Sequence, residues 1–343
     1  MPHRAFLAFI LPSLTAMIVF IALPLVSIAY QSLFIEHQKL LVSVETCDPF
    51  GCQSEQRIDA QGMARLRAEA PAGRFNGLAT YTNATHLAFA EIRQIWREAR
   101  DVGSALRQIM NLQFYKALAF TLLFTLVVTP LSMVLGFAIA LAVNALPRVL
   151  RGTITYYTIL PMIVPSLLGA LVLFWMIDSR GLIGSALQVL FDDRELSVKS
   201  SPALTWMALF AYGIWSSAPY VFIVSYAGLQ TVPRETLESA MVDGASLWAR
   251  LRHVILPHLR PLATFLLIVN IMDNFRVFET IIGFNATAYA SSLSVLIFND
   301  LRRGDSPLFG SAAASSMLTI MCIAILITPS MIRSWTVFRE KAQ

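Results

Sequence analysis

The stretch "ESAMVDGASLWARLRHVILP", residues 238–257, interrupts a chain that consists mostly of long apolar runs. It mixes acidic, basic and apolar residues around Asp243-Gly244 and ends at Pro257. Glycine allows the positive φ of a sharp bend, and proline is poorly tolerated in a helix beyond its first turn. The pattern therefore predicts a helix, a bend at Gly244, and a second short helix that stops at Pro257.

The residues around the bend support this prediction. The first helix is expected over residues 233–242, because Pro233 suits a first helical turn and the glutamates that follow favour the positive end of the helix dipole. Asp243, or Ser246 further along, can cap the second helix. A connection as long as residues 231–258 usually has structure of its own.

The composition indicates a membrane protein. The chain has 343 residues, of which 56% are hydrophobic and only 14% are charged. A helix needs about 20 apolar residues to cross a bilayer. Six runs have spanning length and predict six transmembrane helices of an all-α fold: residues 5–35, 117–147, 152–177, 200–233, 261–284 and 306–332.

The positive residues predict the orientation of these spans. With the N-terminus inside, the inner segments hold about twice as many Lys and Arg as the two short outer loops. We therefore expect both termini and the loop at residues 231–258 to be cytoplasmic. The net charge of +5 follows from this topology, and no basic cluster indicates binding of nucleic acid.

This topology divides the chain into three parts. Residues 1–35 are the N-terminus and first span, residues 36–113 form an extracytoplasmic insert, and residues 114–343 form a five-helix core that includes the loop at 231–258. The sequence does not assign a role to the insert.

Two cysteines of the insert predict a disulfide. Cys47 and Cys52 flank Asp-Pro-Phe-Gly, which favours a turn, and the expected compartment is oxidising. Two free thiols or a metal pair are the alternatives, although no histidine lies at metal-ligand spacing. Cys322 lies in the last span and is most simply a packing residue.

One spacing pattern runs through the whole cytoplasmic loop. It reads Glu238-Ser239-Ala240, three residues, Gly244, nine residues, Val254, one residue, Leu256-Pro257. This resembles the EAA loop of permease subunits in bacterial ATP-binding-cassette importers: Glu-Ala-Ala, three residues, Gly, nine residues, Ile, one residue, Leu-Pro. Ser239 and Val254 depart from it mildly. The stretch "NIMDNFRVFETI" and the six-span layout are similar to the carbohydrate-uptake branch of that family.

The resemblance implies that residues 234–256 couple this chain to a cytoplasmic ATPase. Glu238 would pair with a basic residue of the ATPase, Gly244 would make the bend, and Asp243 would cap or brace it. The implied coupling residues are Glu238, Ser239, Ala240, Asp243, Gly244, Leu256 and Pro257. The alternative is an amphipathic helix pair that rests on lipid headgroups, but such a pair has no need of a glycine at a fixed spacing.

The resemblance also implies a set of partners. They are a second homologous permease, two copies of the ATPase with its ATP and Mg, an extracytoplasmic binding protein, and a sugar or sugar derivative. This chain would form half of the translocation path in a bacterial cytoplasmic membrane. It contains no Gly-x4-Gly-Lys-Ser/Thr phosphate loop and no catalytic constellation, so we expect a transport subunit without a cofactor of its own.

The fifth expected span carries ionisable residues. Asp273, Arg276 and Glu279 follow one another at intervals of three residues, and Asn270 and Asn274 extend the same polar side. Ionisable residues at membrane depth face protein or water, because each costs about 2.5–3.5 kcal/mol on insertion scales. They form either a substrate path, in which Arg276 balances the acids or meets an anionic group, or an ion-pair network that holds the span against the second permease.

Three aromatic residues of the fourth span are further candidates for the substrate path. Tyr212, Trp215 and Tyr220 can offer aromatic faces to a sugar. Packing, or a belt at the membrane interface, is the simpler explanation for each alone.

Two other functions are compatible with parts of the sequence. A proton-coupled secondary transporter would use Asp273 or Glu279 and would need no ATPase. A membrane-bound enzyme or assembly factor would work through residues 36–113 and would tolerate the loss of Glu238 and Gly244. Polyols, disaccharides, glycosides and anionic sugar derivatives all remain open as substrates.

Overall fold

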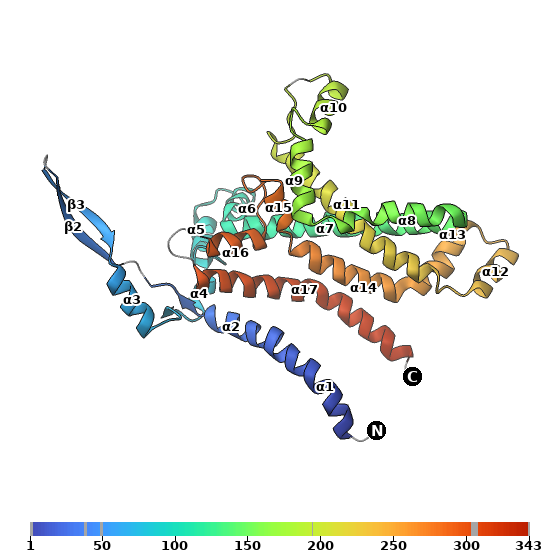
Figure 1. The fold of residues 1–343 in the computed structure, drawn as a ribbon, viewed down its shortest axis with the longest axis horizontal. Coiled ribbons are helices and arrows are strands. Elements are labelled where there is room, and N and C mark those ends of the chain that lie inside the picture. The colour runs from blue at the N-terminus through green and yellow to red at the C-terminus, as the bar shows by residue number, and fades with distance from the viewer. Residues whose placement is uncertain (1–2, 38–39, 49–50, 194, 303–307, 342–343) are drawn as a thin grey trace. The chain divides into compact units, whose positions relative to one another are not determined.

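A computed structural model describes residues 3–37, 40–48, 51–193, 195–302 and 308–341 (Figure 1). The chain forms two compact units. The first comprises Met1–Tyr115 and Leu296–Ile320, and the second comprises Lys116–Val295 and Met321–Gln343.

The first unit holds the N-terminal apolar helices and the insert of residues 36–113. Its elements are α1 (His3–Met17), the π-helical turn η1 (Ile18–Ala22), α2 (Leu23–Gln31), β1 (Phe34–Ile35), β2 (Leu41–Asp48), β3 (Gly51–Ile58), α3 (Ala60–Glu69), β4 (Arg74–Phe75), α4 (Ala79–Thr82), α5 (Phe89–Glu98) and α6 (Val102–Asn111). β1 pairs antiparallel with β4, and β2 pairs antiparallel with β3. Asp101 separates α5 from α6, since its side chain caps α6 in a capping box with Ser104.

Polar side chains of the insert bind the first turn of α17 (Phe309–Lys341) within this unit. The Glu36 carboxylate accepts a hydrogen bond from the Gly310 N–H at 2.8 Å, and His86 Nε2 lies 3.0 Å from the Ser311 carbonyl oxygen. Ser311 Oγ also donates to Asp300 Oδ2 at 2.7 Å. Burial lowers the pKa of His86, because a desolvated imidazole disfavours its charged form.

The hairpin of β2 and β3 carries the two cysteines of the predicted disulfide. Its backbone register places Cys47 opposite Cys52. Their side chains lie outside the part of the chain that the structure describes, so the disulfide stays a prediction.

The second unit contains most of the helices. They are α7 (Gln113–Ala145), which begins in the first unit, α8 (Arg148–Ile163), α9 (Ser166–Met176), α10 (Leu182–Phe191), α11 (Pro202–Leu229), α12 (Arg234–Val242), α13 (Leu247–Arg250), the π-helical turn η2 (Leu251–Ile255), α14 (Leu256–Phe275), α15 (Glu279–Gly283), and parts of α16 (Leu293–Leu301) and α17. α11 packs on α8 and on α14, whereas α9 leaves their common direction (Figure 1).

The prediction of an all-α membrane protein is confirmed. Among the described residues, five helical segments are long and apolar enough to cross a membrane: Phe9–Gln31, Gln113–Ala145, Pro202–Leu229, Leu247–Phe275 and Phe309–Ile332. α8 and α9 together supply a sixth if the pair counts as one span.

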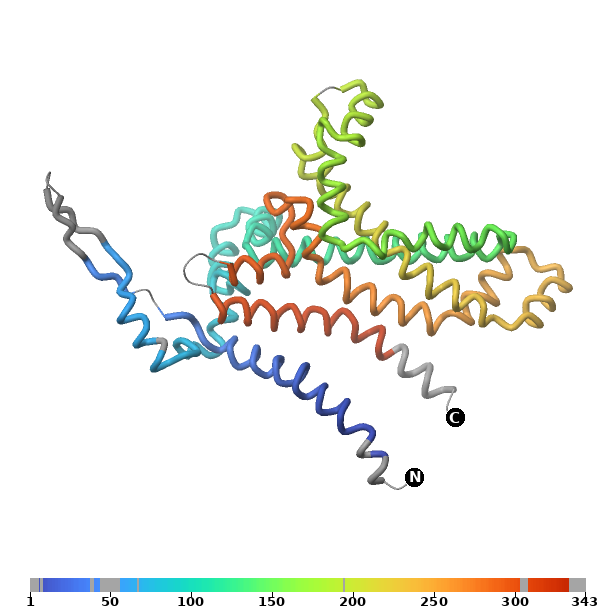
Figure 2. Tube along the Cα trace, in the orientation of Figure 1, coloured from blue at the N-terminus to red at the C-terminus, as the bar shows by residue number. Residues whose placement is uncertain are grey.

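That sixth segment is sharply bent within the run predicted as one span over residues 152–177. α8 and α9 meet at an angle of 94°, and the turn between them is visible in Figure 2. Val164 at the turn is extended, with φ −76° and ψ 122°, because the ring of Pro165 disfavours helical backbone in the preceding residue. The segment is therefore a broken span or a re-entrant loop.

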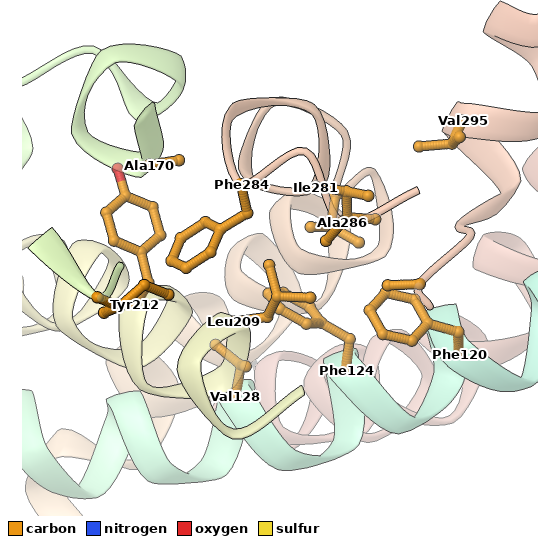
Figure 3. Packing of buried hydrophobic residues seen from close by; sticks show 13 residues of the cluster. Phe120, Phe124, Val128, Ala170, Leu209, Tyr212, Ile281, Phe284, Ala286 and Val295 are labelled. Atoms are coloured by element: carbon orange, nitrogen blue, oxygen red, sulfur yellow. The ribbon is translucent and has the colours of Figure 1, made fainter. Parts of the chain in front are cut away.

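The core of the second unit gathers side chains from α7, α9, α11, α15 and α16 (Figure 3). Phe124 and Val128 of α7 meet Leu209 of α11, Ala170 of α9 and Ile281 of α15, all of them buried. Because lipid is as apolar as these side chains, close packing and interhelical hydrogen bonds must hold such helices together. The break at Val164 brings α9 to this core, where α9 packs on α15.

α7 and α11 approach closely at a glycine. A Cβ on Gly136 would lie 2.6 Å from the Ala218 carbonyl oxygen and 2.7 Å from Val221 Cβ. Gly152 in α8 is a matched contrast, since a Cβ there would meet nothing within 4 Å.

We expect Gly136→Ala to destabilise the purified protein by about 1–3 kcal/mol, the usual cost of overpacking. Gly152→Ala should leave stability unchanged or raise it by up to about 1 kcal/mol, because alanine favours helix. Thermal unfolding in detergent measures both. Equal melting temperatures for the two variants would contradict the close approach of α7 and α11.

Candidate coupling loop and substrate cavity

The loop between α11 and α14 contains the predicted first helix and bend. α12 spans Arg234–Val242, and Gly244 has φ +73°. A Cβ at Gly244 would meet nothing within 4 Å, so its requirement for glycine is conformational. Ser246 caps the next helix, because its side chain accepts from the Ala249 N–H at 3.2 Å. Asp243 instead ends α12 through its backbone N–H.

The loop exposes an apolar surface beside its acidic residues. The exposed fractions are 52% for Met241, 87% for Val242, 79% for Leu247 and 65% for Trp248. Glu238 is exposed as well. An apolar patch with charge at its edge is typical of a surface that binds protein.

The second helix does not stop at Pro257, and this part of the prediction was wrong. α13, η2 and α14 form one uninterrupted helical segment, Leu247–Phe275. A proline in an α-helix leaves the carbonyl four residues back unpaired and clashes with it. In η2 the Leu256 N–H bonds to the Leu251 carbonyl, a π-helical step that accommodates the proline.

The far end of this helix corrects a second expectation. The predicted span over residues 261–284 would have carried its charges inside one helix, but α14 ends at Phe275. Arg276 follows with φ −90° and ψ 19°, and Glu279 lies in the first turn of α15. Ser292 Oγ donates to the Val277 carbonyl at 2.6 Å, so a side chain satisfies the broken backbone.

A cavity of about 630 Å³ opens at this helix end. Its polar lining comes from the starts of α9 and α15 and from α11 and α14: Ser166, Ser216, Ser217, Tyr220, Asn270, Asp273, Asn274, Arg276, Glu279 and Thr280. Phe124, Pro161, Met162 and Val164 are among its apolar lining residues. The break between α8 and α9 therefore contributes to the wall.

The structure brings together all five polar candidates of the fifth span, but only one of the three aromatic candidates. Tyr220 lines the cavity, whereas Tyr212 and Trp215 are not among its lining residues. Tyr212 is buried in the core of Figure 3, and its hydroxyl donates to the Ser166 carbonyl at 2.8 Å. Its role is to pack α11 against α9.

The two asparagines belong to the wall in different ways. Asn274 is buried, and its Nδ2 donates to Thr129 Oγ1 of α7 at 3.0 Å, which ties α14 to α7. Asn270 is buried too, and its Nδ2 donates to the Leu266 carbonyl at 2.9 Å within α14. Each amide oxygen is left with acceptor capacity, although Ser217 Oγ lies 3.5 Å from the Asn274 oxygen.

The charged residues of the wall are unequally paired. Arg276 Nη2 donates to Asp273 Oδ1 at 2.8 Å, and both side chains are 65% exposed in this chain. An exposed pair of this kind contributes little to stability. Among the described residues, Glu279 has neither a hydrogen bond nor an ion pair through its side chain.

Sequence reasoning missed the serines and the threonine of the wall. Ser216 and Ser217 interrupt the apolar fourth span just before Pro219, a small polar break that signals an inward face. Thr280 carries no comparable signal, because its position depends on the end of α14 at Phe275.

A multi-span helical chain with a polar cavity between its helices is the architecture of a membrane permease. Residues 132–336 match the family of binding-protein-dependent transport system inner membrane components, and the chain belongs to that family. It is thus a transport subunit of the inner membrane.

Relatives within this family transport different substrates. The chain is 29% identical over 222 residues to the trehalose/maltose transport system permease protein of Thermococcus litoralis, covering 64% of this chain and 74% of that one. It is 28% identical over 229 residues to the sn-glycerol-3-phosphate transport system permease protein of Yersinia pestis, covering 64% and 75%. One chain of a bacterial ABC transporter that imports the acidic polysaccharide alginate shares the fold, with a TM-score of 0.60 at 19% identity over 81% of this chain and 98% of that chain.

Substitutions of two tyrosines of α11 test the placement of Tyr212 in the core and of Tyr220 in the cavity wall. Tyr212→Phe removes a hydrogen bond from the core and should lower the free energy of unfolding by about 1 kcal/mol. Tyr220→Phe changes only the cavity wall and should leave the free energy of unfolding unchanged. Thermal unfolding of the purified protein separates them, and the opposite order of melting temperatures would contradict the placement of both residues.

Proposed function

We propose that this chain is the permease subunit of an ATP-driven sugar importer. It forms half of the translocation path and couples to a separate ATPase through residues 234–256. Membership of the family supports the importer, and the trehalose/maltose and glycerol-phosphate relatives support a sugar or sugar derivative as substrate.

One observation carries the coupling proposal. Figure 1 shows α12 at one end of the helical segment Leu247–Phe275 and α15 at the other. The exposed loop lies at the first end, and residues at the second end line the polar cavity. The segment changes direction where α13 and η2 meet α14, but its backbone stays helical through the change (Figure 1). A helix resists bending far more than a loop does, so a displacement of its cytoplasmic end moves the cavity wall as well.

The loop has the features that docking requires. Gly244 fixes the angle between α12 and α13, and the exposed apolar patch with Glu238 faces outward for a partner. When the ATPase closes on ATP, it pulls the loop with it. The helix then shifts Asn270 and Asn274 relative to α7, which changes the access to the cavity from one side of the membrane to the other.

The cavity suits a polyhydroxylated molecule. Its wall offers hydroxyls from Ser216 and Ser217, amide oxygens from Asn270 and Asn274, and the aromatic ring of Tyr220. Hydroxyl and amide groups exchange hydrogen bonds with sugar hydroxyls, and an aromatic ring packs on the apolar face of a sugar.

The remaining parts of the proposal concern partners and orientation. A second homologous permease completes the path, two ATPase copies hold ATP and Mg, and an extracytoplasmic binding protein delivers the substrate. Both termini are cytoplasmic. The proton-coupled alternative, which would use Asp273 or Glu279, has less support because the family is a binding-protein-dependent one.

The proposal is tested by purifying the tagged chain from its native membrane in mild detergent, identifying the proteins that accompany it and measuring ATP hydrolysis. We expect a second permease and an ATPase. Glu238→Ala should lower ATP hydrolysis. Purification of the chain without any nucleotidase would contradict the proposal.

Two variants of Gly244 refine this test. Gly244→Val should reduce ATP hydrolysis by the complex about tenfold, because a β-branched residue at positive φ costs about 1–2 kcal/mol or more. Gly244→Asn should stay within about twofold, because asparagine tolerates the left-handed region. Both variants should still insert, since no atom lies near the site of the new side chain. Wild-type hydrolysis in Gly244→Val would contradict the coupling role of the bend.

A further inference from the structure

The relatives of this chain raise a question about the charge of its substrate. Trehalose and maltose are uncharged, whereas glycerol 3-phosphate and alginate are anions. The sequence leaves both classes open, because Arg276 can in principle meet an anionic group. The cavity wall distinguishes between them.

The charges of the wall sum to a negative value. Its ionisable residues are two carboxylates, Asp273 and Glu279, and one guanidinium, Arg276. Asp273 accepts from Arg276 at 2.8 Å, so the single positive charge already has its counter-ion on the same helix end. The Glu279 carboxylate remains without an ion pair among the described residues, and it is exposed toward the cavity.

Several oxygens of the wall keep the capacity to accept, while Arg276, Tyr220 and Thr280 keep N–H or O–H groups that can donate to a sugar hydroxyl. The amide groups of Asn270 and Asn274 each direct an N–H to another protein atom, and the Ser216 hydroxyl donates to the Gly213 carbonyl at 3.2 Å. Their oxygens therefore remain to accept from a ligand. A sugar hydroxyl can donate to these oxygens, whereas a phosphate or carboxylate ligand offers them only further acceptors.

The C-terminal end of α14 adds to the negative electrostatic potential of the cavity. The cavity lies at its C-terminal end, where Asp273, Asn274 and Arg276 line the wall. Unpaired carbonyls make that end of a helix partially negative. The first residues of α9 and α15, Ser166 and Glu279, also line the cavity, and the Glu279 carboxylate offsets the partially positive end of α15. Anion sites in proteins use uncompensated cations, or helix N-termini without such a carboxylate.

We infer that the cavity selects uncharged, polyhydroxylated substrates and rejects anions, and that Glu279 is the specificity-determining residue. The inference rests on the proposed function, because it takes the cavity as part of the path. It places this importer with the trehalose-type relatives in substrate charge. Arg276 then positions Asp273 and donates to hydroxyl oxygens with its other N–H groups.

The inference is tested by measuring the electrostatic potential of the cavity with a reactive cysteine, which requires no knowledge of the substrate. Ser217→Cys, and separately Ser216→Cys, is made in a background with Cys47→Ser, Cys52→Ser and Cys322→Ala. The whole purified complex is reconstituted in liposomes. The rates of modification by a cationic and an anionic methanethiosulfonate reagent are then compared with their rates on a free thiol.

The cationic reagent should be favoured about tenfold after this normalisation, because charge effects are strong in a partly dehydrated cavity. Glu279→Gln should reduce the preference severalfold, and the matched control Glu279→Asp should retain it. Equal rates, a preference for the anionic reagent, or an unchanged preference in Glu279→Gln would overturn the inference. So would cysteines that react with neither reagent, since the cavity would then be closed to charged solutes.

Failure of the proposed function gives a different result. Suppose that the bulky cationic reagent modifies Ser217→Cys and leaves ATP-driven uptake of the natural substrates unchanged. In that case the cavity is not part of the translocation path, whatever its electrostatic potential. If uptake is blocked and the cationic preference is absent, the path is supported and the charge inference alone is wrong.

Discussion

The accommodation of Pro257 by a π-helical turn is the constraint on which the rest of the structure depends. The helix changes direction at this turn without ending, so helical backbone, not a flexible connection, joins the exposed loop to the cavity. The turn at Leu251–Ile255 moves one hydrogen bond to a carbonyl five residues back and keeps the helix continuous. A local adjustment of the backbone thus allows one segment, Leu247–Phe275, to serve both a docking surface and a transport path.

A second proline has the opposite effect. Pro165 forces Val164 out of the helical region, and the chain turns by 94° between α8 and α9. The turn places Ala170 in the aromatic core with Tyr212 and lets the residues around Val164 form part of the cavity wall. Pro257 therefore lies within a continuous helical segment, whereas Pro165 marks a sharp turn between two helices.

The sequence predicted the features that depend only on residues close together in the chain. Apolar runs predicted the spans, and the Asp243-Gly244 pair predicted the bend, because φ +73° is a property of one residue. The five polar residues predicted for the fifth span line one cavity, although Arg276 and Glu279 lie beyond the end of α14. The end of α14 at Phe275 was missed, because it depends on contacts between helices. Tyr212 shows the same limit: its type suits a sugar site, but its neighbours place it in the core.

The central claim is that the segment from the loop to the cavity moves as one body. It is tested most directly by electron–electron distance measurement between spin labels at Ala249→Cys and Met272→Cys, on either side of the π-helical turn, in the assembled complex and a background without native cysteines. A helical rise of 1.5 Å per residue would give a separation of about 35 Å in a straight helix, and the change of direction at the turn makes the expected distance shorter. We expect one narrow distance that is the same with and without trapped ATP. A distance that changes by several ångströms or broadens when ATP is trapped would show that the angle at the turn changes, and would contradict the claim.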